Sequence, residues 1–534
     1  MKTYILNFLK KYKKNIFLIF FLSILLPIIN NITPLLSKAL LDKGILTKNI
    51  SLIILLSILI IISYALKYLF NNIIQSKVIK VNLDLVSNLK KDVINSTINL
   101  PITFHDKNSS QYILSRINEV DNLSKLFSSD LIMFFINIFT ALVAFCLIFQ
   151  KNIFLSLLSI SFIPLFIFLS NITFKKINDQ IFNSLETSAV TNRKMHSVLK
   201  GTLTLKQFNE ENRLLNDINK DIDKLTQTIS LQNLTINKNV NLISFFTIFV
   251  QTFLVGIVAI FIAKDNLSIG DYLSISQYIS LIYSPVLVYQ NIKINIKPAL
   301  ISYKRLKELY KNDSKLKQKH ILKSISNINV SDLCFEYNNN TPVLKNISFN
   351  IAKGDKLLIS GENGSGKTTL SKLLLGFYDN YSGDIIIDDE NLKSIDENSL
   401  RERISIVPQK SYLFDMSILE NIRIANNKLN DAEFIKKIDY LKGTNLFKGI
   451  DLNANLIENG KNISGGQIQR ISLARILMRD FDVCIFDEIT NSLDKESQHI
   501  IKEIIKNEFN SKICIFISHN EYLDDIITKK IILP

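Results

Sequence analysis

The sequence has few cysteines and little glycine in its amino-terminal part. The four cysteines lie far apart, at Cys146, Cys334, Cys484 and Cys514. None belongs to a CxxC or metal-type spacing, so neither a structural zinc site nor a disulfide framework is indicated. Residues 1–319 hold only 4 of the 15 glycines, which sets them apart from the rest of the chain. The length of 534 residues and the 47% apolar fraction exclude a disordered tail protein and allow at least two sizeable domains.

Charged residues are absent from six long apolar windows in the first 300 residues. These windows cover residues 15–37, 49–66, 131–150, 152–174, 239–263 and 272–292. A bilayer core about 30 Å thick needs roughly 20 residues of helix, and a desolvated charge at mid-membrane costs several kcal/mol. We therefore predict six transmembrane helices. Because only about 14 residues precede the first window, we expect no leader-cleaving peptidase domain before it.

The formal net charge of +15 is unevenly distributed. Residues 1–319 hold 37 basic and 18 acidic side chains (+19), whereas residues 320–534 hold 26 and 30 (−4). The two long links between windows, 67–130 and 175–238, carry 8 and 10 basic residues, and cationic loops stay in the cytoplasm. We therefore expect a multi-pass protein of the plasma membrane or the cell inner membrane, with both termini cytoplasmic. We attribute the positive net charge to the orientation of the protein in the membrane, and we expect no nucleic-acid partner.

A phosphate-binding pattern follows a predicted buried strand at residues 356–360. Residues 361–368 read GENGSGKT and fit GxxxxGK[ST]. Glycines let the backbone N–H groups surround a phosphate, and the following helix offers its positive end. Lys367 is expected to reach the β- and γ-phosphates, and the Thr368 hydroxyl to ligate Mg²⁺.

A second candidate element is the acidic pair Asp487 and Glu488, which ends the apolar segment 483–486. In a doubly wound sheet, an acid at the carboxyl end of such a strand lies beside the phosphate loop and can hold Mg²⁺. The adjacent carboxylate is well placed to activate water. In isolation the pair could equally be a solvated strand end, but the phosphate-binding pattern favours the catalytic interpretation.

Residues 463–467, ISGGQ, resemble the LSGGQ signature of ATP-binding-cassette (ABC) ATPases. Further motifs of that family occur in its order: the adenine-stacking aromatic Tyr337, the Q-loop Gln409, the D-loop 491–494 and the switch histidine His519. Softer matches extend into the first half. There, residues 104–117 and 201–211 resemble the two intracellular loops of exporter-type half-transporters, and residues 267–271 resemble the start of the sixth span. In the second half, Glu458 resembles the acidic X-loop residue of the same family. The chain is thus identified, over nearly its whole length, as a member of the exporter-type half-transporters.

This resemblance implies a fold and a division into domains. The expected fold is an all-α six-helix transmembrane domain plus an α/β P-loop nucleotide-binding domain with an antiparallel β subdomain and a helical subdomain. The expected boundaries are 1–310 for the transmembrane domain, 311–325 for a linker and 326–534 for the ATPase domain.

The resemblance also implies ATP as ligand, Mg²⁺ as cofactor and specific site residues. The implied catalytic residues are Glu488, His519 and Gln409, and the implied metal ligands are Thr368, Gln409 and Asp487. The residues implied to contact the nucleotide are Tyr337, Gly361, Asn363, Gly364, Ser365, Gly366, Lys367, Thr368, Thr369, Ser464, Gly465, Gly466, Gln467 and Asp494. In this family the signature of one subunit completes the phosphate site of the other, which implies a dimer. Because the key motif residues are all present, we expect a homodimer with two competent sites.

The expected function is ATP-driven export, by alternating access, of a hydrophobic or amphipathic substrate: a small peptide, a lipid-like molecule or a drug. Lys67, Lys77, Lys293 and Lys297 cluster near cytoplasmic ends of the windows, where an anionic headgroup or peptide carboxylate could dock. Positive-inside placement explains these lysines equally well. An ATP-gated channel or regulator without active transport remains the alternative, whereas a soluble chromosome-type ATPase would lack the six windows.

Overall fold

The computed structural model describes residues 12–127, 129–264, 267–310, 319–337, 342–489, 493–518 and 521–533. The chain forms two compact units. The first comprises Met1–Leu100 and Asn108–Asp313, and the second comprises Pro101–Lys107 and Ser314–Pro534. The expected linker, 311–325, includes residues 311–318, which lie outside the described residues.

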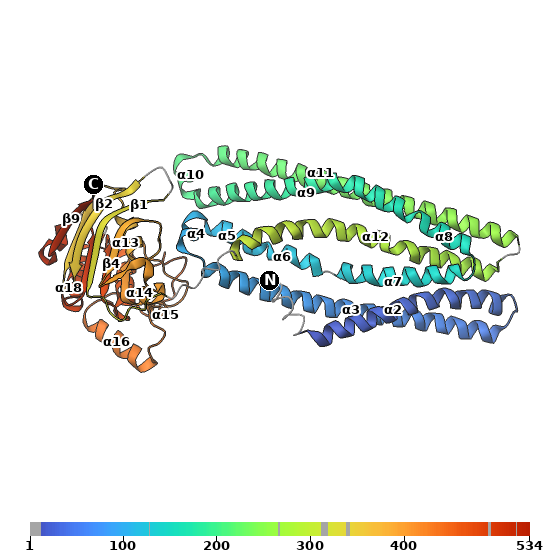
Figure 1. The fold of residues 1–534 in the computed structure, drawn as a ribbon, viewed down its shortest axis with the longest axis horizontal. Coiled ribbons are helices and arrows are strands. Elements are labelled where there is room, and N and C mark those ends of the chain that lie inside the picture. Colours follow the sequence, from blue (N-terminus) through green and yellow to red (C-terminus); the bar gives the residue numbers. More distant parts are fainter. Residues whose placement is uncertain are drawn as a thin grey trace. The chain divides into compact units, whose positions relative to one another are not determined.

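The first unit consists of long helices joined by short connections (Figure 1). In chain order they are α2 (Lys13–Ala39), the π-helical η1 (Leu40–Ile45), α3 (Ile50–Ile98), α5 (Ser110–Asn118), α6 (Val120–Leu123), η2 (Ser124–Phe127), α7 (Ser129–Phe149), α8 (Ile153–Ser161), α9 (Ile163–Lys200), α10 (Thr202–Phe208), α11 (Glu211–Ala263), α12 (Ile269–Leu306) and η3 (Lys307–Tyr310). Helix α2 packs along α3, α7 along α12, and α9 along α11. The long links between the predicted spans are thus mainly continuations of the helices.

Among the described residues of this unit, five helical segments are long and apolar enough to cross a membrane. They are Lys13–Ile45, Ile50–Ile98, Ser129–Phe149, Ile153–Lys200 and Glu211–Ala263, and each covers, to within one residue at either end, all of one predicted window. The sixth window, 272–292, lies within the continuous helix α12 but is not among these five. Serine, tyrosine and glutamine side chains dilute its apolar residues.

Two tyrosines of α12 are buried inside the first unit and have hydrogen-bond partners on other helices. The Tyr283 hydroxyl is fully buried and donates a hydrogen bond of 2.5 Å to the backbone carbonyl of Ser159. The Tyr278 hydroxyl donates one of 3.2 Å to the carbonyl of Asn31. A helix surrounded by other helices can carry such groups because its neighbours satisfy them. The modest hydropathy of α12 is therefore consistent with a central position in the helical unit.

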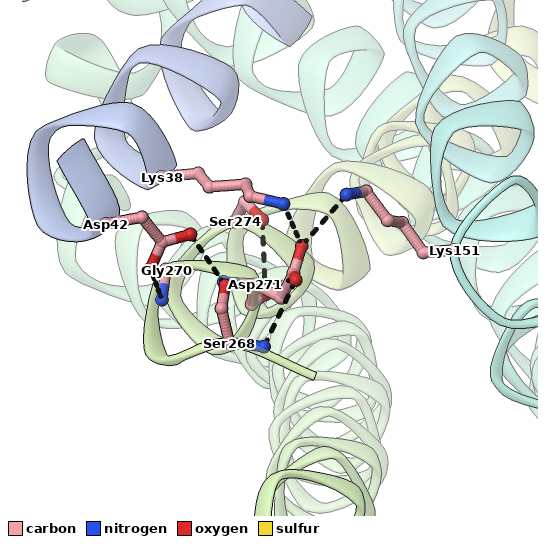
Figure 2. Close-up of polar contacts among 7 residues, drawn as sticks. All are labelled: Lys38, Asp42, Lys151, Ser268, Gly270, Asp271 and Ser274. Carbon is pink, nitrogen blue, oxygen red and sulfur yellow. Dashed lines mark hydrogen bonds and ion pairs between the residues drawn. The ribbon is translucent and has the colours of Figure 1, made fainter. Parts of the chain in front are cut away.

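A polar cluster lies at one end of the helices (Figure 2). It joins the end of α2 with η1, the link between α7 and α8, and the start of α12. Asp271, at the start of α12, accepts a 2.6 Å hydrogen bond from Lys38 and lies 3.3 Å from the ammonium group of Lys151. Asp42, in η1, accepts hydrogen bonds from the Ser268 hydroxyl at 2.6 Å and from the Gly270 N–H at 2.9 Å. These contacts hold the amino-terminal end of α12 against η1 and against the carboxyl-terminal end of α2.

Substitution of Gly270 by alanine is expected to destabilise the first unit by about 1–3 kcal/mol. A Cβ at this position would lie 2.6 Å from the Asp42 carboxylate, which would have to give up its hydrogen bonds to move away. Thermal unfolding of the detergent-solubilised protein measures the change. Gly256→Ala is the matched control, because a Cβ on Gly256 meets no atom within 4 Å. Equal unfolding temperatures for the two variants would contradict this role of Gly270.

The second unit contains two sheets (Figure 1). The antiparallel sheet has the order β2-β1-β4-β5 and consists of β1 (Asn327–Glu336), β2 (Pro342–Ala352), β4 (Ser382–Ile387) and β5 (Glu390–Asn391). The second sheet has the order β6-β7-β8-β3-β9 and is parallel throughout. It consists of β3 (Lys356–Gly361), β6 (Ile404–Val407), β7 (Val483–Asp487), β8 (Ile513–Ile517) and β9 (Lys529–Leu533). Every residue of β7 and β8 is buried, as expected for central strands covered on both faces.

Helices complete the α/β arrangement of this unit. They are α4 (Ile102–Lys107), α13 (Lys367–Leu374), η4 (Leu392–Ser394), α14 (Glu397–Arg403), α15 (Ile418–Arg423), α16 (Asp431–Gly443), α17 (Gly465–Leu477), α18 (Lys495–Glu508) and η5 (Glu521–Ile526). One apolar core combines the antiparallel sheet, one face of the parallel sheet and α13. A second core combines the other face with residues of α15, α16, α17 and α18. The parallel strands are held between these cores, so their carboxyl ends form a rigid base for the site.

Candidate functional site

The loop between β3 and α13 has the backbone that a phosphate cradle requires. Gly361, Gly364 and Gly366 have φ angles of +151°, +92° and +90°. Side chains rarely tolerate these values. A Cβ on Gly366 would also lie 2.6 Å from Leu344. The Ser365 hydroxyl is buried and has no hydrogen-bond partner in the described part of the chain, so it is available to an acceptor atom of a ligand.

Lys367 begins α13 and is 7% exposed. Its ammonium group donates hydrogen bonds to the carbonyls of Gly361, at 2.7 Å, and Glu362, at 2.8 Å. Both acceptors are neutral, so these contacts position the lysine over the loop without neutralising its charge. An anion in the loop would find this charge together with the amino-terminal end of α13.

Thr368 and Asp487 are brought together from the start of α13 and the end of β7. The Thr368 hydroxyl donates a 3.3 Å hydrogen bond to Asp487, which is 4% exposed. Burial raises the pKa of Asp487 above its ordinary value, and the negative charge of Glu488 raises it further. The hydrogen bond from Thr368 and the positive charge of Lys367 lower it, but they do not outweigh the burial. Within the described ranges, no group of three or more His, Cys, Asp or Glu side chains is placed so that it could hold a metal ion by itself. The residues nevertheless suit Mg²⁺, which binds through one or two carboxylates plus ligand phosphates.

Glu488 follows Asp487 and has an uncommon backbone conformation, with φ at +54°. Its N–H donates a 2.8 Å hydrogen bond to the carbonyl of Ile517 in the neighbouring strand β8. Its carboxylate accepts a hydrogen bond from the Gln409 side chain, although the two residues are 79 positions apart. A left-handed non-glycine residue at such a position is typical of a functional site.

Gln469 also takes part in this arrangement, and the sequence motifs did not single it out. It lies on α17, is 8% exposed, and its side-chain amide donates a 3.0 Å hydrogen bond to the backbone carbonyl of Gln409. This bond connects the helix that carries the signature to the residue that contacts Glu488. In the sequence, only its position two residues after the signature Gln467 could have indicated that Gln469 takes part in the site.

Tyr337, the residue predicted to stack on the base, lies beside the first turn of α13. Its hydroxyl and that of Thr369 are 2.9 Å apart. Its ring makes edge contacts with Phe335, at 5.0 Å between centroids, and with Tyr378, at 5.5 Å. The tyrosine is 39% exposed, so part of its ring is open to a ligand.

The signature residues form the start of α17. Ser464 and Gln467 make reciprocal side-chain to backbone bonds, a capping box, and Gln467 also donates to the carbonyl of Gly449. Ser464 and Gly465 are exposed. Among the described residues, no hydrogen bond joins the signature to the loop 361–366. The signature is therefore presented on the surface of its own chain.

Asp494 caps α18 by accepting a 3.2 Å hydrogen bond from the N–H of Ser497. A Cβ on Gly466 would lie 3.4 Å from the Asp494 carboxylate, so the starts of α17 and α18 are adjacent. The predicted switch histidine His519 and the first D-loop residue, Asn491, lie outside the described residues.

The segment Pro101–Lys107 belongs to the second unit. Asp106 accepts hydrogen bonds from Tyr378, at 2.5 Å, and from Lys372 on α13, at 2.9 Å. Burial opposes ionisation of Asp106, but these two hydrogen bonds outweigh it and lower its pKa. The segment is thus bonded to the helix that begins at the phosphate loop.

Two family models match the chain. The model of the ABC transporter transmembrane region matches residues 16–286, and that of the ABC transporter matches residues 344–491. The chain belongs to the ABC transporter family. Its ATPase domain hydrolyses ATP, and the hydrolysis is coupled to export across the membrane in which its helices are embedded.

Several characterised ABC transporters are similar over most of this chain. The transport/processing ATP-binding protein ComA of Streptococcus pneumoniae is 26% identical over 91% of this chain and 67% of its own length. The lactococcin-G-processing and transport protein LagD of Lactococcus lactis is 25% identical, with shares of 93% and 72%. The ATP-dependent lipid A-core flippase of Wigglesworthia glossinidia brevipalpis is 28% identical, with shares of 81% and 76%.

A solved structure has the same fold. A bacterial Atm1-family ABC exporter with ATP bound superposes with a TM-score of 0.86 and 18% identity, over 98% of this chain and 94% of that one. The prediction of a helical transmembrane domain fused to an α/β nucleotide-binding domain is thereby confirmed.

Proposed function

We propose that this ABC exporter works as a homodimer that moves a hydrophobic or amphipathic substrate out of the cytoplasm or the inner leaflet by alternating access. The observation that carries the proposal is the convergence of Lys367, Thr368, Asp487 and Glu488 at the carboxyl ends of β3 and β7. A phosphate-binding lysine, a hydroxyl and carboxylate suited to Mg²⁺, and a second carboxylate for water are the parts that phosphoryl transfer requires.

In this proposal the described residues divide the work of hydrolysis. Lys367 and the loop N–H groups bind phosphates. Thr368, Asp487 and Gln409 would hold Mg²⁺, which would neutralise developing negative charge. Glu488 removes a proton from the attacking water, and Gln409 positions the Glu488 carboxylate. The role of His519 in steadying the γ-phosphate rests on its place in the motif order.

The remaining nucleotide contacts are divided between two subunits. Tyr337 stacks on the base, and the loop residues contact the phosphates on the same chain. We assign to the partner's bound nucleotide the residues Ser464, Gly465, Gly466, Gln467 and Asp494. The exposure of Ser464 and Gly465, and their lack of bonds to the loop of their own chain among the described residues, favour this arrangement.

The proposed membrane arrangement has six spans, with α12 as the sixth. The hydroxyls of Tyr278 and Tyr283 on α12 donate to backbone carbonyls of neighbouring helices, which makes α12 compatible with a lipid bilayer. The positive charge of the long links favours cytoplasmic termini in a plasma membrane or cell inner membrane. We retain 1–310, 311–325 and 326–534 as the transmembrane domain, linker and ATPase domain.

We further propose that Pro101–Lys107 carries motion from the ATPase site to the helices. Asp106 is bonded to Lys372 of α13, and α3 ends only a few residues before this segment. A shift of α13 on nucleotide binding would therefore displace the segment directly. From the family resemblance, we assign a similar role in carrying motion to residues 186–193 of α9, where Glu186 lies 3.9 Å from Arg305.

Transport in proteoliposomes tests the proposed function. The protein is reconstituted with its ATPase domain outward, and the uptake of fluorescent lipid, hydrophobic peptide and drug probes is measured with ATP and with a non-hydrolysable analogue. We expect ATP-dependent uptake of at least one probe and stimulation of ATPase activity by the same probe. Probe-independent hydrolysis, with ATP-gated ion conductance and no uptake, would instead identify a channel or regulator.

A further inference from the structure

A cavity of about 390 Å³ lies among α7, α8, α9 and α12 in the first unit. Its wall is almost entirely apolar and includes Phe134, Phe145, Phe166, Ile282 and Val286. Cavities of this size accept ligands of a few hundred Å³ and bind them mainly through apolar contact. The few polar groups in the wall therefore determine which ligand fits.

The polar groups of the cavity gather at one end. Ser170, Tyr289 and Gln290 belong to the wall, and Lys293 follows Gln290 by one turn of α12. The Lys293 ammonium group donates to the Ser170 hydroxyl at 3.1 Å and to the Asn171 side chain at 2.6 Å. It also lies 5.1 Å from the centre of the Tyr289 ring. The cavity thus has an apolar body, and a cationic side chain lies beside its polar end.

Two features show that this polar end has unused binding capacity. Gln290 is 4% exposed, and its side-chain oxygen accepts a 3.1 Å bond from Asn239, but its side-chain N–H₂ has no partner among the residues that the structure describes. Within the described part of the chain, the hydrogen bonds of Lys293 go to neutral oxygens, and no carboxylate pairs with it. A buried donor without a partner costs about 1–3 kcal/mol, so a ligand that accepts from Gln290 would recover that cost.

We propose that this cavity binds an acyl chain of an anionic lipid, with the lipid's anionic headgroup accepting hydrogen bonds from Lys293 and Gln290. This inference deepens the proposed function, on which it rests, by naming the substrate class. A hydrocarbon chain suits the apolar wall because it has no polar group to satisfy. A peptide backbone in the same place would leave N–H and C=O groups unpaired, at a cost for each group.

Binding in nanodiscs tests the proposal. The full chain is placed in phosphatidylcholine nanodiscs, and two lipids with the same photoreactive acyl chain are titrated: phosphatidylglycerol and phosphatidylcholine. We expect the anionic lipid to label residues of α7, α9 and α12 at lower concentration than the zwitterionic lipid. Lys293→Gln should weaken the labelling by phosphatidylglycerol about tenfold, the effect of one charge-assisted bond, and leave that by phosphatidylcholine unchanged.

Lys304→Gln is the matched control, since it removes the same charge from an exposed position about three turns further along α12 and should change neither labelling nor basal ATPase activity. Gln290→Leu provides a second variant of the site and should also weaken phosphatidylglycerol labelling selectively. Equal labelling by the two lipids, equal effects of the two lysine variants, or displacement of the lipid by a hydrophobic peptide at the same site would overturn the proposal. Selective labelling without uptake in proteoliposomes would retain this site and reject transport.

Discussion

Glu488→Gln is expected to lower the ATPase rate by about 100-fold or more while leaving ATP binding intact. General base catalysis contributes typically 10²–10⁴-fold to a reaction rate, and an amide cannot accept the proton from the attacking water. ATP hydrolysis by the purified protein gives the rate, and binding of a fluorescent ATP analogue gives the affinity. A variant that binds but does not hydrolyse is also expected to accumulate in the ATP-bound state.

The geometry around Glu488 makes this variant a test of chemistry and not of folding. The Gln409 side chain donates to the carboxylate, and an amide oxygen in the same place can accept that bond. The backbone N–H of Glu488 bonds to Ile517 whatever side chain is present. Glu503→Gln is the control, because Glu503 is an exposed residue of α18. Full hydrolysis by the Glu488 variant, or an equal loss in both variants, would contradict the general-base role.

The local parts of the site were predictable from the sequence because each has a local physical cause. The positive φ angles of Gly361, Gly364 and Gly366 follow from a backbone that must turn around a phosphate. The apolar segment before Asp487 is a central strand because only a strand covered on both faces is apolar throughout. Motif spacing therefore identified the loop and the acids.

Contacts between distant residues were not predictable in the same way. No local pattern indicates that Gln469 bonds to Gln409, or that Asp106 bonds to Tyr378 across 272 positions. Such bonds depend on how helices pack onto the sheet, which one sequence does not encode in any short segment. The sequence placed Lys293 only near a cytoplasmic end of a span, and its position beside an apolar cavity emerged from the packing of α9 against α12.

The membrane helices show the same division between local and tertiary causes. Among the described residues, five helical segments are apolar enough to be recognised as candidate spans by composition alone. Helix α12 is not among them, because it carries polar residues, and at least one of these is satisfied by another helix, as the bond from Tyr283 to Ser159 shows. Its place in the bundle is thus a property of the assembled unit.

Asp487→Asn is expected to have opposite effects on activity and stability. The loss of a metal-binding carboxylate removes several kcal/mol of charge stabilisation in the transition state, so hydrolysis should fall about 100-fold or more. The nucleotide-free protein, in contrast, should unfold at a higher temperature than the wild type. Hydrolysis assays with excess Mg²⁺ and thermal unfolding without nucleotide or metal measure the two effects.

The stability gain follows from the direction of the pKa shift. Burial and the charge of Glu488 raise the pKa of Asp487 in the folded state, so the folded protein favours the protonated carboxyl. At pH values below the pKa that Asp487 has in the unfolded chain, this preference stabilises the fold fully. The stabilisation is lost as the pH rises through the higher pKa that Asp487 has in the folded protein. At neutral pH the ionised carboxylate therefore opposes folding. An amide removes this penalty and can still accept the hydrogen bond from Thr368.

A carboxylate with the opposite shift provides the control. Lys502 lies 2.6 Å from Asp525 and lowers its pKa, as does Lys506, so its ionised form favours the folded state above the unfolded pKa. Asp525→Asn should therefore lower the unfolding temperature slightly, since an exposed ion pair contributes about 0–1 kcal/mol, and should leave hydrolysis unchanged. The gain in the Asp487 variant should shrink as the pH falls. An unfolding temperature below that of the wild type at neutral pH would show that the ionised carboxylate stabilises the fold, contrary to the direction of its pKa shift.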